Sequence, residues 1–144
     1  MDKHDVILNV RGSHVVGGEE DFSELITEGL LSRDEGKCII EYEESELSGT
    51  ENTLTCLIVE ADKIRLRRTG ESSTEFVFRR SQMYETAYDT PFGMIQMTVL
   101  PTQITSDISS DKSGSVDLEY VVKIGSYSAI NRLNIGYKQK DFKS

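Results

Sequence analysis

The chain has 144 residues, of which 37% are hydrophobic and 28% charged, with 11 Gly and only 2 Pro. This composition excludes a disordered or fibrous protein, and the length is sufficient for one domain with its own hydrophobic core. We therefore expect residues 1–144 to form a single domain.

The formal net charge of −9 disfavours two classes of partner. An acidic surface repels phosphate backbones and anionic lipid headgroups, so we expect neither nucleic acid nor a membrane as partner. The first residues, Met1-Asp2-Lys3-His4-Asp5, lack the pattern of a secretory signal, and the longest apolar run, Cys56–Val59, is too short to span a membrane. These features predict a cytoplasmic protein.

Cysteine and histidine are too few to suggest a metal or thiol centre. Cys38 and Cys56 lack Cys-x-x-Cys spacing, and the two histidines, His4 and His14, lie in one strand-like segment. We therefore expect reduced core cysteines, no metal and no cofactor.

Taken in chain order, the apolar residues recur with a period of two, which is typical of strands buried on one face. In the second of these series, Phe22, Ile26 and Leu30 share the face that we expect to be buried. The alternating series are Val6–Val10, Phe22–Leu30, Cys38–Tyr42, Leu54–Ile58, Ile64–Leu66, Phe76–Phe78, Val116–Ile124 and Tyr127–Tyr137.

The breaks between these series are short and carry turn residues, as at Gly17-Gly18, Asp34–Lys37, Glu60–Lys63 and Gly125-Ser126. Parallel strands need crossovers of a dozen or more residues, and no helical segment of that length is present. We therefore expect an antiparallel, mostly meander sheet of about 8–10 strands, whose short hairpins favour a closed barrel over a Greek-key sandwich.

Three charged residues interrupt the apolar faces. By parity Arg68 points to the same side as Ile64 and Leu66, while Glu28 and Glu44 continue the apolar faces of their own strands. A buried guanidinium is costly unless it is paired. Two interpretations stay open. In the first, these residues lie at the barrel rim, or Arg68 forms a structural salt bridge with Glu28 or Glu44. In the second, they form a polar floor or mouth of a ligand cavity.

The sharpest local motif is the corner Tyr88-Asp89-Thr90-Pro91-Phe92-Gly93. Pro91 and Gly93 occupy the positions that they favour in a type I β-turn. The motif is interpreted either as a rigid turn in which Asp89 accepts bonds from turn amides, or as a binding or acid–base pair of Asp89 with the Tyr88 phenol.

Several motifs in a fixed order resemble the YwiB-like family of uncharacterised bacterial proteins. They are Ile26-Thr27-Glu28-Gly29, Tyr42-Glu43-Glu44-Ser45, Gly49-Thr50 followed by Thr53, Arg68-x-Gly70-Glu71, the Tyr88–Gly93 corner and Asn131-x-Leu133. The resemblance covers His4 to Lys138. It implies a closed barrel similar to the calycins, the lipocalin-like β-barrels, and a Gram-positive source, but no activity, substrate or catalytic residue.

The first functional hypothesis is a noncatalytic barrel that holds a small, mostly apolar ligand whose anionic group faces Arg68. Apolar cavities with a few convergent polar groups are the usual form of such sites. The candidate ligand-binding residues are Arg68, Glu28, Tyr42, Glu44, Tyr88, Asp89 and Tyr120.

A second hypothesis is a protein-interaction or structural module that acts through the barrel exterior. Leu25, Leu31, Leu57 and Val59 fall off the expected buried faces. Outward apolar residues of this kind suggest a homodimer patch.

A third hypothesis is a small acid–base enzyme with Asp89 or Glu44 as general base and the Tyr88 phenol as donor. The sequence contains no recognisable nucleophile–His–acid set, metal spacing, phosphate loop or dinucleotide fingerprint that would favour this hypothesis.

Overall fold

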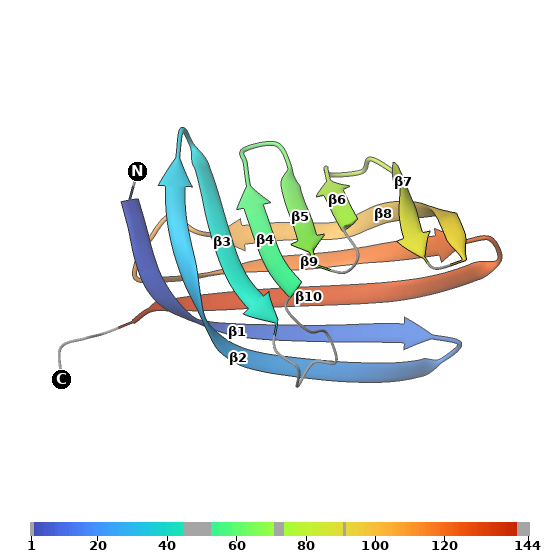
Figure 1. The fold of residues 1–144 in the computed structure, drawn as a ribbon, viewed down its shortest axis with the longest axis horizontal. Coiled ribbons are helices and arrows are strands. Elements are labelled where there is room, and N and C mark those ends of the chain that lie inside the picture. The colour runs from blue at the N-terminus through green and yellow to red at the C-terminus, as the bar shows by residue number, and fades with distance from the viewer. Residues whose placement is uncertain (1, 45–52, 71–73, 91, 141–144) are drawn as a thin grey trace.

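The computed structural model describes residues 2–44, 53–70, 74–90 and 92–140, without the side chains of residues 2, 44, 74 and 88–90. These residues form ten β-strands and no helix (Figure 1), which confirms the predicted all-β fold. The strands are β1 (Asp2–Val16), β2 (Glu19–Asp34), β3 (Lys37–Glu44), β4 (Thr53–Val59), β5 (Ile64–Thr69), β6 (Thr74–Phe78), β7 (Tyr84–Thr90), β8 (Gly93–Asp107), β9 (Ser113–Ile124) and β10 (Tyr127–Gln139).

The strands form one antiparallel sheet in the order β6-β5-β4-β3-β2-β1-β10-β9-β8-β7. The N- and C-terminal strands pair in the middle of this order, from Val6↔Gln139 to Val15↔Ile130. The two outermost strands, β6 and β7, contact each other, and the isolated bridge Arg79↔Gln82 lies in the connection between them. The sheet therefore curls into a nearly closed barrel, as predicted, with its seam between β6 and β7.

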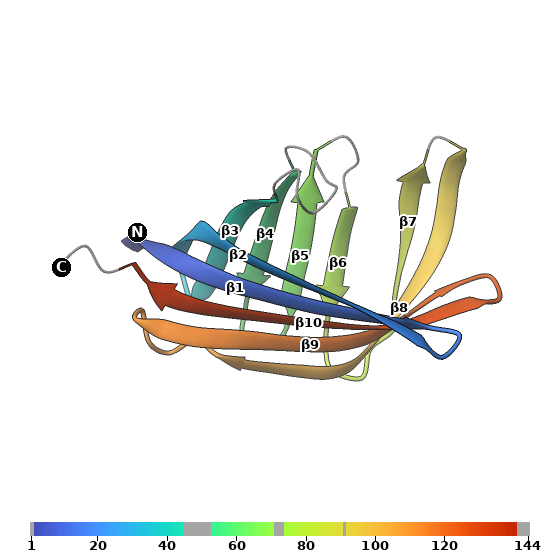
Figure 2. The same cartoon turned by 90° about the horizontal axis from the view of Figure 1, so that it is seen from below.

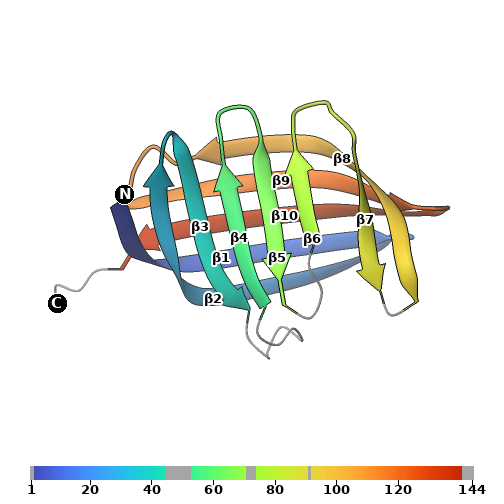
Figure 3. The same ribbon diagram turned by 45° about the horizontal axis from the view of Figure 1, so that its top comes forward.

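Strand length divides the barrel into two halves. β1, β2, β8, β9 and β10 have 12 to 16 residues, whereas β3–β7 have 5 to 8. β3 pairs with β2 only along Gly29–Asp34, at the end of β2. The short strands β3–β6 therefore cover only one part of the long strands (Figures 2 and 3). We call this part the closed half, and the part where the long strands run beyond β3–β6 the open half.

Apolar side chains fill the closed half. Gly29 of β2 permits close packing there, because a Cβ at this position would lie 2.5 Å from Leu8 Cδ1 and 2.7 Å from the Glu41 carbonyl oxygen. The predicted alternation in β1, β3, β5 and β9 is confirmed. The largest fully buried apolar side chains are Phe78, Leu8, Leu31, Ile40, Leu57, Ile135, Val6, Val99 and Val116.

The prediction of which face of β2 is buried was wrong. Phe22 and Ile26 are 77% and 66% exposed, whereas Leu31 is fully buried and Leu25 packs against the core. The reason is the register: Leu31 lies opposite Ile40 of β3, and residues directly opposite each other share a sheet face.

The same correction applies to β4. Leu57 and Val59 were expected to point outward, but both are buried because they lie opposite Ile40 and Cys38 of β3. The outward series of this strand is Leu54, Cys56 and Ile58, which is half-buried or exposed. The residues expected to form a dimer patch are therefore core residues.

Candidate functional site

The open half contains a hollow of about 790 Å³ on the inner face of the long strands. Residues of β1, β2, β9 and β10 line it, together with Arg68 near the end of β5. Phe22 and Ile26 of β2 border it, but their side chains lie on the outward face of β2, opposite Ser13 and Asn9 of β1, and are largely exposed. Its volume is within the range of about 300–1,000 Å³ that is usual for small-molecule sites.

Arg68 occupies the inward position that the sequence predicts. It lies on the face of Ile64 and Leu66, which are both buried, and opposite Thr55 of β4. Arg68 itself is half-buried and lines the hollow. The guanidinium therefore lies where the packed core ends and the hollow begins.

Tyr120 of β9 lies on the same boundary. Its ring centroid is 4.8 Å from that of Phe78 and 6.1 Å from that of Phe76, and its side chain also lines the hollow. Burial raises the pKa of the Tyr120 phenol, while the positive charge of Arg68 opposes this rise. The site thus combines a fixed cation with a neutral phenol.

A row of polar residues crosses the floor of the hollow. Asp21 of β2 lies opposite His14 of β1, His14 opposite Asn131 of β10, and Asn131 opposite Tyr120 of β9. Neighbouring strands are about 4.8 Å apart, so His14 and Tyr120 are separated by about 10 Å across the sheet.

Two hydrogen bonds orient the His14 ring. Nδ1 lies 2.7 Å from Asn131 Oδ1, and Nε2 lies 3.2 Å from the Tyr127 hydroxyl. The two partners lie on opposite sides of the imidazole and hold its ring in one orientation. We call His14, Asn131 and Tyr127 the histidine trio.

The rest of the lining is largely apolar. Val10, Leu25 and Leu133 line the inner surface of the hollow. An apolar surface with polar groups at separate points suits an amphipathic molecule rather than a highly charged one.

The predicted site residues do not all come together. Arg68 and Tyr120 both line the hollow, whereas Tyr42 is buried among the core residues of the closed half. Glu28 does not point inward as expected. It is exposed and forms an ion pair with Lys140, 3.1 Å away, because it lies on the outward face of β2, opposite to the face of Leu31.

The side chains of the other three predicted residues, Glu44, Tyr88 and Asp89, lie outside the described residues. The backbone of the corner is a β7–β8 hairpin in which Thr90 pairs with Gly93, so the predicted turn is confirmed in its position. The proposed pairing of Arg68 with Glu44 stays a prediction.

Sequence reasoning missed the histidine trio as part of a site. In the sequence, His14 suggests only a partner for a metal or a thiol, and Asn131 stands only in the family motif Asn131-x-Leu133. Parity was the signal that could have found both, since His14 continues the face of Val6, Leu8 and Val10. The contact between them depends on the pairing of β1 with β10, which brings together residues 117 positions apart.

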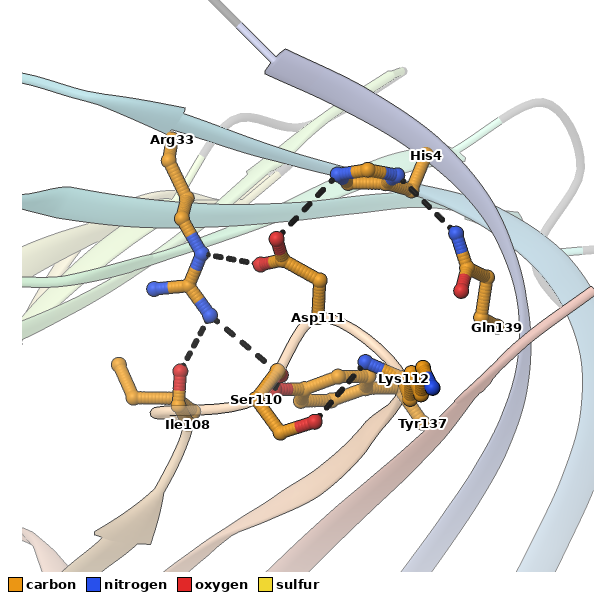
Figure 4. Close-up of polar contacts among 8 residues, drawn as sticks. All are labelled: His4, Arg33, Ile108, Ser110, Asp111, Lys112, Tyr137 and Gln139. Atoms are coloured by element: carbon orange, nitrogen blue, oxygen red, sulfur yellow. Dashed lines mark hydrogen bonds and ion pairs between the residues drawn. The ribbon is translucent and has the colours of Figure 1, made fainter.

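A second polar cluster lies at the far end of the closed half, where the β8–β9 connection meets β1, β2 and β10 (Figure 4). Arg33 Nε donates to Asp111 Oδ1 at 2.6 Å, and one of its terminal nitrogens donates to the carbonyl oxygens of Ile108 and, at 3.4 Å, Ser110. The hydrogen bond from Arg33 is the main reason that the pKa of Asp111 lies below its usual value. We call this set the Arg33 latch.

β1 and β10 complete the latch. His4 Nε2 lies 3.6 Å from Asp111 Oδ2, and Gln139 Nε2 donates to His4 Nδ1 at 3.1 Å (Figure 4). The Tyr137 hydroxyl donates to the Ser110 carbonyl oxygen at 2.5 Å. Strands from both ends of the chain thus hold the β8–β9 connection in place, which indicates a structural role for the latch.

The thiols offer no nucleophile to either cluster. Burial raises the pKa of both Cys38 and Cys56, so neither is a reactive thiolate. Within the described ranges, no group of three or more His, Cys, Asp or Glu side chains could hold a metal ion. Nor does any helix suited to crossing a membrane occur among the residues that the structure describes.

Comparisons with known proteins agree with this architecture. A family model described as "Domain of unknown function (DUF1934)" matches residues 8–135. The crystal structure of ywiB protein from Bacillus subtilis is similar, with a TM-score of 0.85 and 18% identity over 96% of this chain and 94% of that chain. At this identity the likeness shows the fold alone, and it confirms the predicted resemblance to YwiB. No curated protein matches the chain.

Proposed function

The chain belongs to the DUF1934 family, and because that membership names no ligand, we propose a function from the hollow itself: noncatalytic binding of a small, mostly apolar molecule with an anionic group. The anionic group lies at Arg68, and the apolar part lies against Val10, Leu25 and Leu133. A likeness to the ligand-binding calycins is part of this proposal.

The observation that carries the proposal is the inward guanidinium at the boundary between a packed core and a hollow. A hydrogen bond between a guanidinium and a carboxylate is stronger than one between neutral groups, and its strength grows as water is excluded. A carboxylate placed there would also accept from the neighbouring Tyr120 phenol, which burial keeps protonated.

The acidity of the rest of the protein restricts the ligand further. Asp21 also lines the hollow, and the acidic groups of the whole chain give it a net charge of −9. A molecule with several negative charges would be repelled by these groups, whereas one carboxylate on an apolar body needs only one cation.

We also propose that this binding takes place in the cytoplasm. The two cysteines support the proposal, because Cys38 lies on the inner face of β3 and Cys56 on the outer face of β4, and a disulfide cannot join opposite faces. The fold therefore uses no internal disulfide and suits a reducing compartment.

The test measures the affinity of three compounds for the wild-type protein and for two matched variants. Decanoic acid, decanol and the apolar anionic dye anilinonaphthalene sulfonate are titrated into the wild-type protein, Arg68→Met and Arg67→Gln. Arg67 is the matched control because it neighbours Arg68 but points outward, where it pairs with Glu75 at 2.9 Å.

We expect Arg68→Met to weaken decanoic acid and dye binding about tenfold or more, which corresponds to the loss of one charged hydrogen bond. Decanol affinity should stay the same in all three proteins, and Arg67→Gln should bind every compound as the wild type does. Equal losses in both variants, or no binding of any compound to the wild type, would contradict the proposal. Native mass spectrometry of the purified protein provides an independent check for a co-purified small molecule.

A further inference from the structure

Strand β2 has a long stretch that is paired on one side only. β2 pairs with β1 over nearly its whole length, but with β3 only along Gly29–Asp34. Among the residues that the structure describes, no strand pairs with the segment Glu19–Glu28 on the side away from β1. We call this segment, which continues past the end of β3 (Figure 1), the free edge of β2. Alternate residues of a strand direct their backbone N–H and C=O groups to the same side, so the free edge can pair with another strand.

The outward side chains of the free edge alternate between acidic and apolar. Leu25 points into the hollow, so the neighbouring positions of opposite parity point outward. These outward residues are Glu20, Phe22, Glu24, Ile26 and Glu28. Phe22 and Ile26 are 77% and 66% exposed. Successive glutamates of this row are about 13 Å apart, with one apolar side chain between each pair.

Acidic residues on an edge strand also protect it, since they discourage pairing with other chains. Protection alone does not account for Phe22 and Ile26, because large exposed apolar side chains on an edge favour pairing. The two features agree if the edge repels acidic strands and accepts a strand of opposite charge. The free edge therefore has the properties of a selective docking surface.

The three outward glutamates are accessible to a partner. Within the described ranges, Glu20 forms no ion pair, whereas Glu24 pairs with Arg11 and Glu28 with Lys140, each at 3.1 Å. Both of these pairs lie on the surface, where ion pairs contribute little to stability. Cations of a partner can therefore share or replace them at small cost.

We propose that the free edge of β2 binds an extended segment of another protein, which adds to the sheet as a further strand. Basic and apolar side chains alternate on the outward face of this segment, so that Lys or Arg lies beside each glutamate and an apolar residue beside Phe22 and Ile26. Backbone hydrogen bonds provide affinity in this mode of recognition, and the alternate side chains provide specificity.

A second copy of the chain does not fit the free edge equally well. The segment Glu19–Glu28 contains five acidic residues and no basic one. Pairing two such edges would place acidic side chains beside each other, which is unfavourable. The inference is independent of ligand binding at Arg68, because it concerns the outward face and the backbone of β2.

The first experiment measures the binding of three fluorescent peptides by anisotropy at low ionic strength. The matching peptide is Lys-Thr-Val-Thr-Lys-Thr-Val-Thr-Lys, which as a strand has all its lysines and valines on one face. One control peptide has glutamate in place of lysine, and the other has the same composition in an order that places lysine and valine on both faces. We expect the wild-type protein to bind the matching peptide about tenfold more tightly than either control, as several cross-strand pairs together provide. Equal binding of the shuffled peptide would overturn the proposal, because net charge alone would then account for the affinity.

Two variants of the free edge test the side chains. Glu20→Lys should weaken binding of the matching peptide about three- to tenfold, because it replaces an attraction by a repulsion. Phe22→Ser should weaken it about two- to fivefold through the loss of one cross-strand contact. The matched controls are Glu85→Lys and Met83→Ser, which make the same changes at exposed positions in and beside the other outermost strand, β7. Both controls should bind as the wild type does, and equal losses in them would overturn the proposal.

Hydrogen exchange distinguishes strand addition from loose attraction. In the free protein, the amides of Glu19–Glu28 that point away from β1 should exchange quickly, and those bonded to β1 slowly. Saturating matching peptide should slow the fast set by about tenfold or more, while the amides of β7 keep their rates. Peptide binding without this protection, no binding of the matching peptide, or a wild-type dimer that protects the same amides would overturn the proposal.

Discussion

The closed and open halves of the barrel are built from the same five long strands but differ in what faces their inner side. In the closed half, β3–β6 cover the long strands, and the inward residues Leu8, Leu31 and Ile135 are fully buried. In the open half the same strands continue without that cover, and their inward residues line a hollow. The extent of the covering strands thus decides where one continuous face becomes a core and where it lines a hollow.

The two halves also differ in how they use polar groups. In the Arg33 latch each polar group binds another group of the protein, and the cluster fastens a connection. In the hollow, Arg68 and Asn131 face the space in which a ligand would lie. The polar groups of the latch thus serve stability, whereas those of the hollow are placed to serve the proposed recognition of a ligand.

The largest expected difference between the halves is in the cost of removing an apolar side chain. Phe78→Ala should lower the free energy of unfolding by about 3–5 kcal/mol, because it removes a fully buried ring and leaves a cavity. Leu25→Ala should cost less than half of that amount, because Leu25 is half-buried and already borders a hollow. Urea unfolding measures both values, and equal costs would contradict the division into a filled half and a hollow half.

The next largest effect is expected at the latch. Arg33→Met should lower the free energy of unfolding by about 1–3 kcal/mol, because it leaves the carbonyl oxygens of Ile108 and Ser110 without their charged donor. The same substitution should leave decanoic acid binding unchanged, since Arg33 lies in the other half. A loss of binding in this variant would show that the two halves do not act independently.

Asp111 should make the latch sensitive to acid. The pKa of its carboxyl is held below the usual value by Arg33, so the unfolded chain binds a proton at a higher pH than the folded protein does. The stabilisation is complete above the unfolded pKa of about 3.9 and is lost as the pH falls further. We expect the melting temperature of Asp111→Asn to lie below that of the wild type at neutral pH, and the difference to shrink below about pH 4. A difference that grows on acidification would refute the latch as described.

The smallest effect on stability is expected at the rim. Phe22→Ser should change the free energy of unfolding by no more than about 0.5 kcal/mol, because the side chain is 77% exposed. It should also leave the binding of anilinonaphthalene sulfonate unchanged, since Phe22 lies on the outward face of β2, opposite to the face of Leu25. A clear loss of dye affinity in this variant would contradict a site on the inner face.

Much of the fold could be predicted from the sequence because strands and turns are local. The period of two, the short turns and the parity of Ile64, Leu66 and Arg68 all depend on near neighbours in the chain. These features correctly placed Arg68 and Tyr120 on the inner face, where both line the hollow.

The failures share one cause, which is that register and strand extent are not local. In β2 the exposed rim residues Phe22 and Ile26 are apolar, so the more apolar series was the wrong one to bury. In β4 the buried residues are Leu57 and Val59, because they lie opposite Ile40 and Cys38 of β3. Alternation alone predicts neither effect, because both depend on which strands lie alongside.

The central claim is that the open half binds a ligand while the closed half does not respond. The most direct test is a map of backbone amide shifts, recorded by NMR as decanoic acid is added to the isotope-labelled protein. We predict that the shifts concentrate at Val10, Leu25, Arg68 and Leu133, with saturation at a single affinity. Shifts centred on the Arg33 latch, or a spectrum that does not change at saturating acid, would contradict the account.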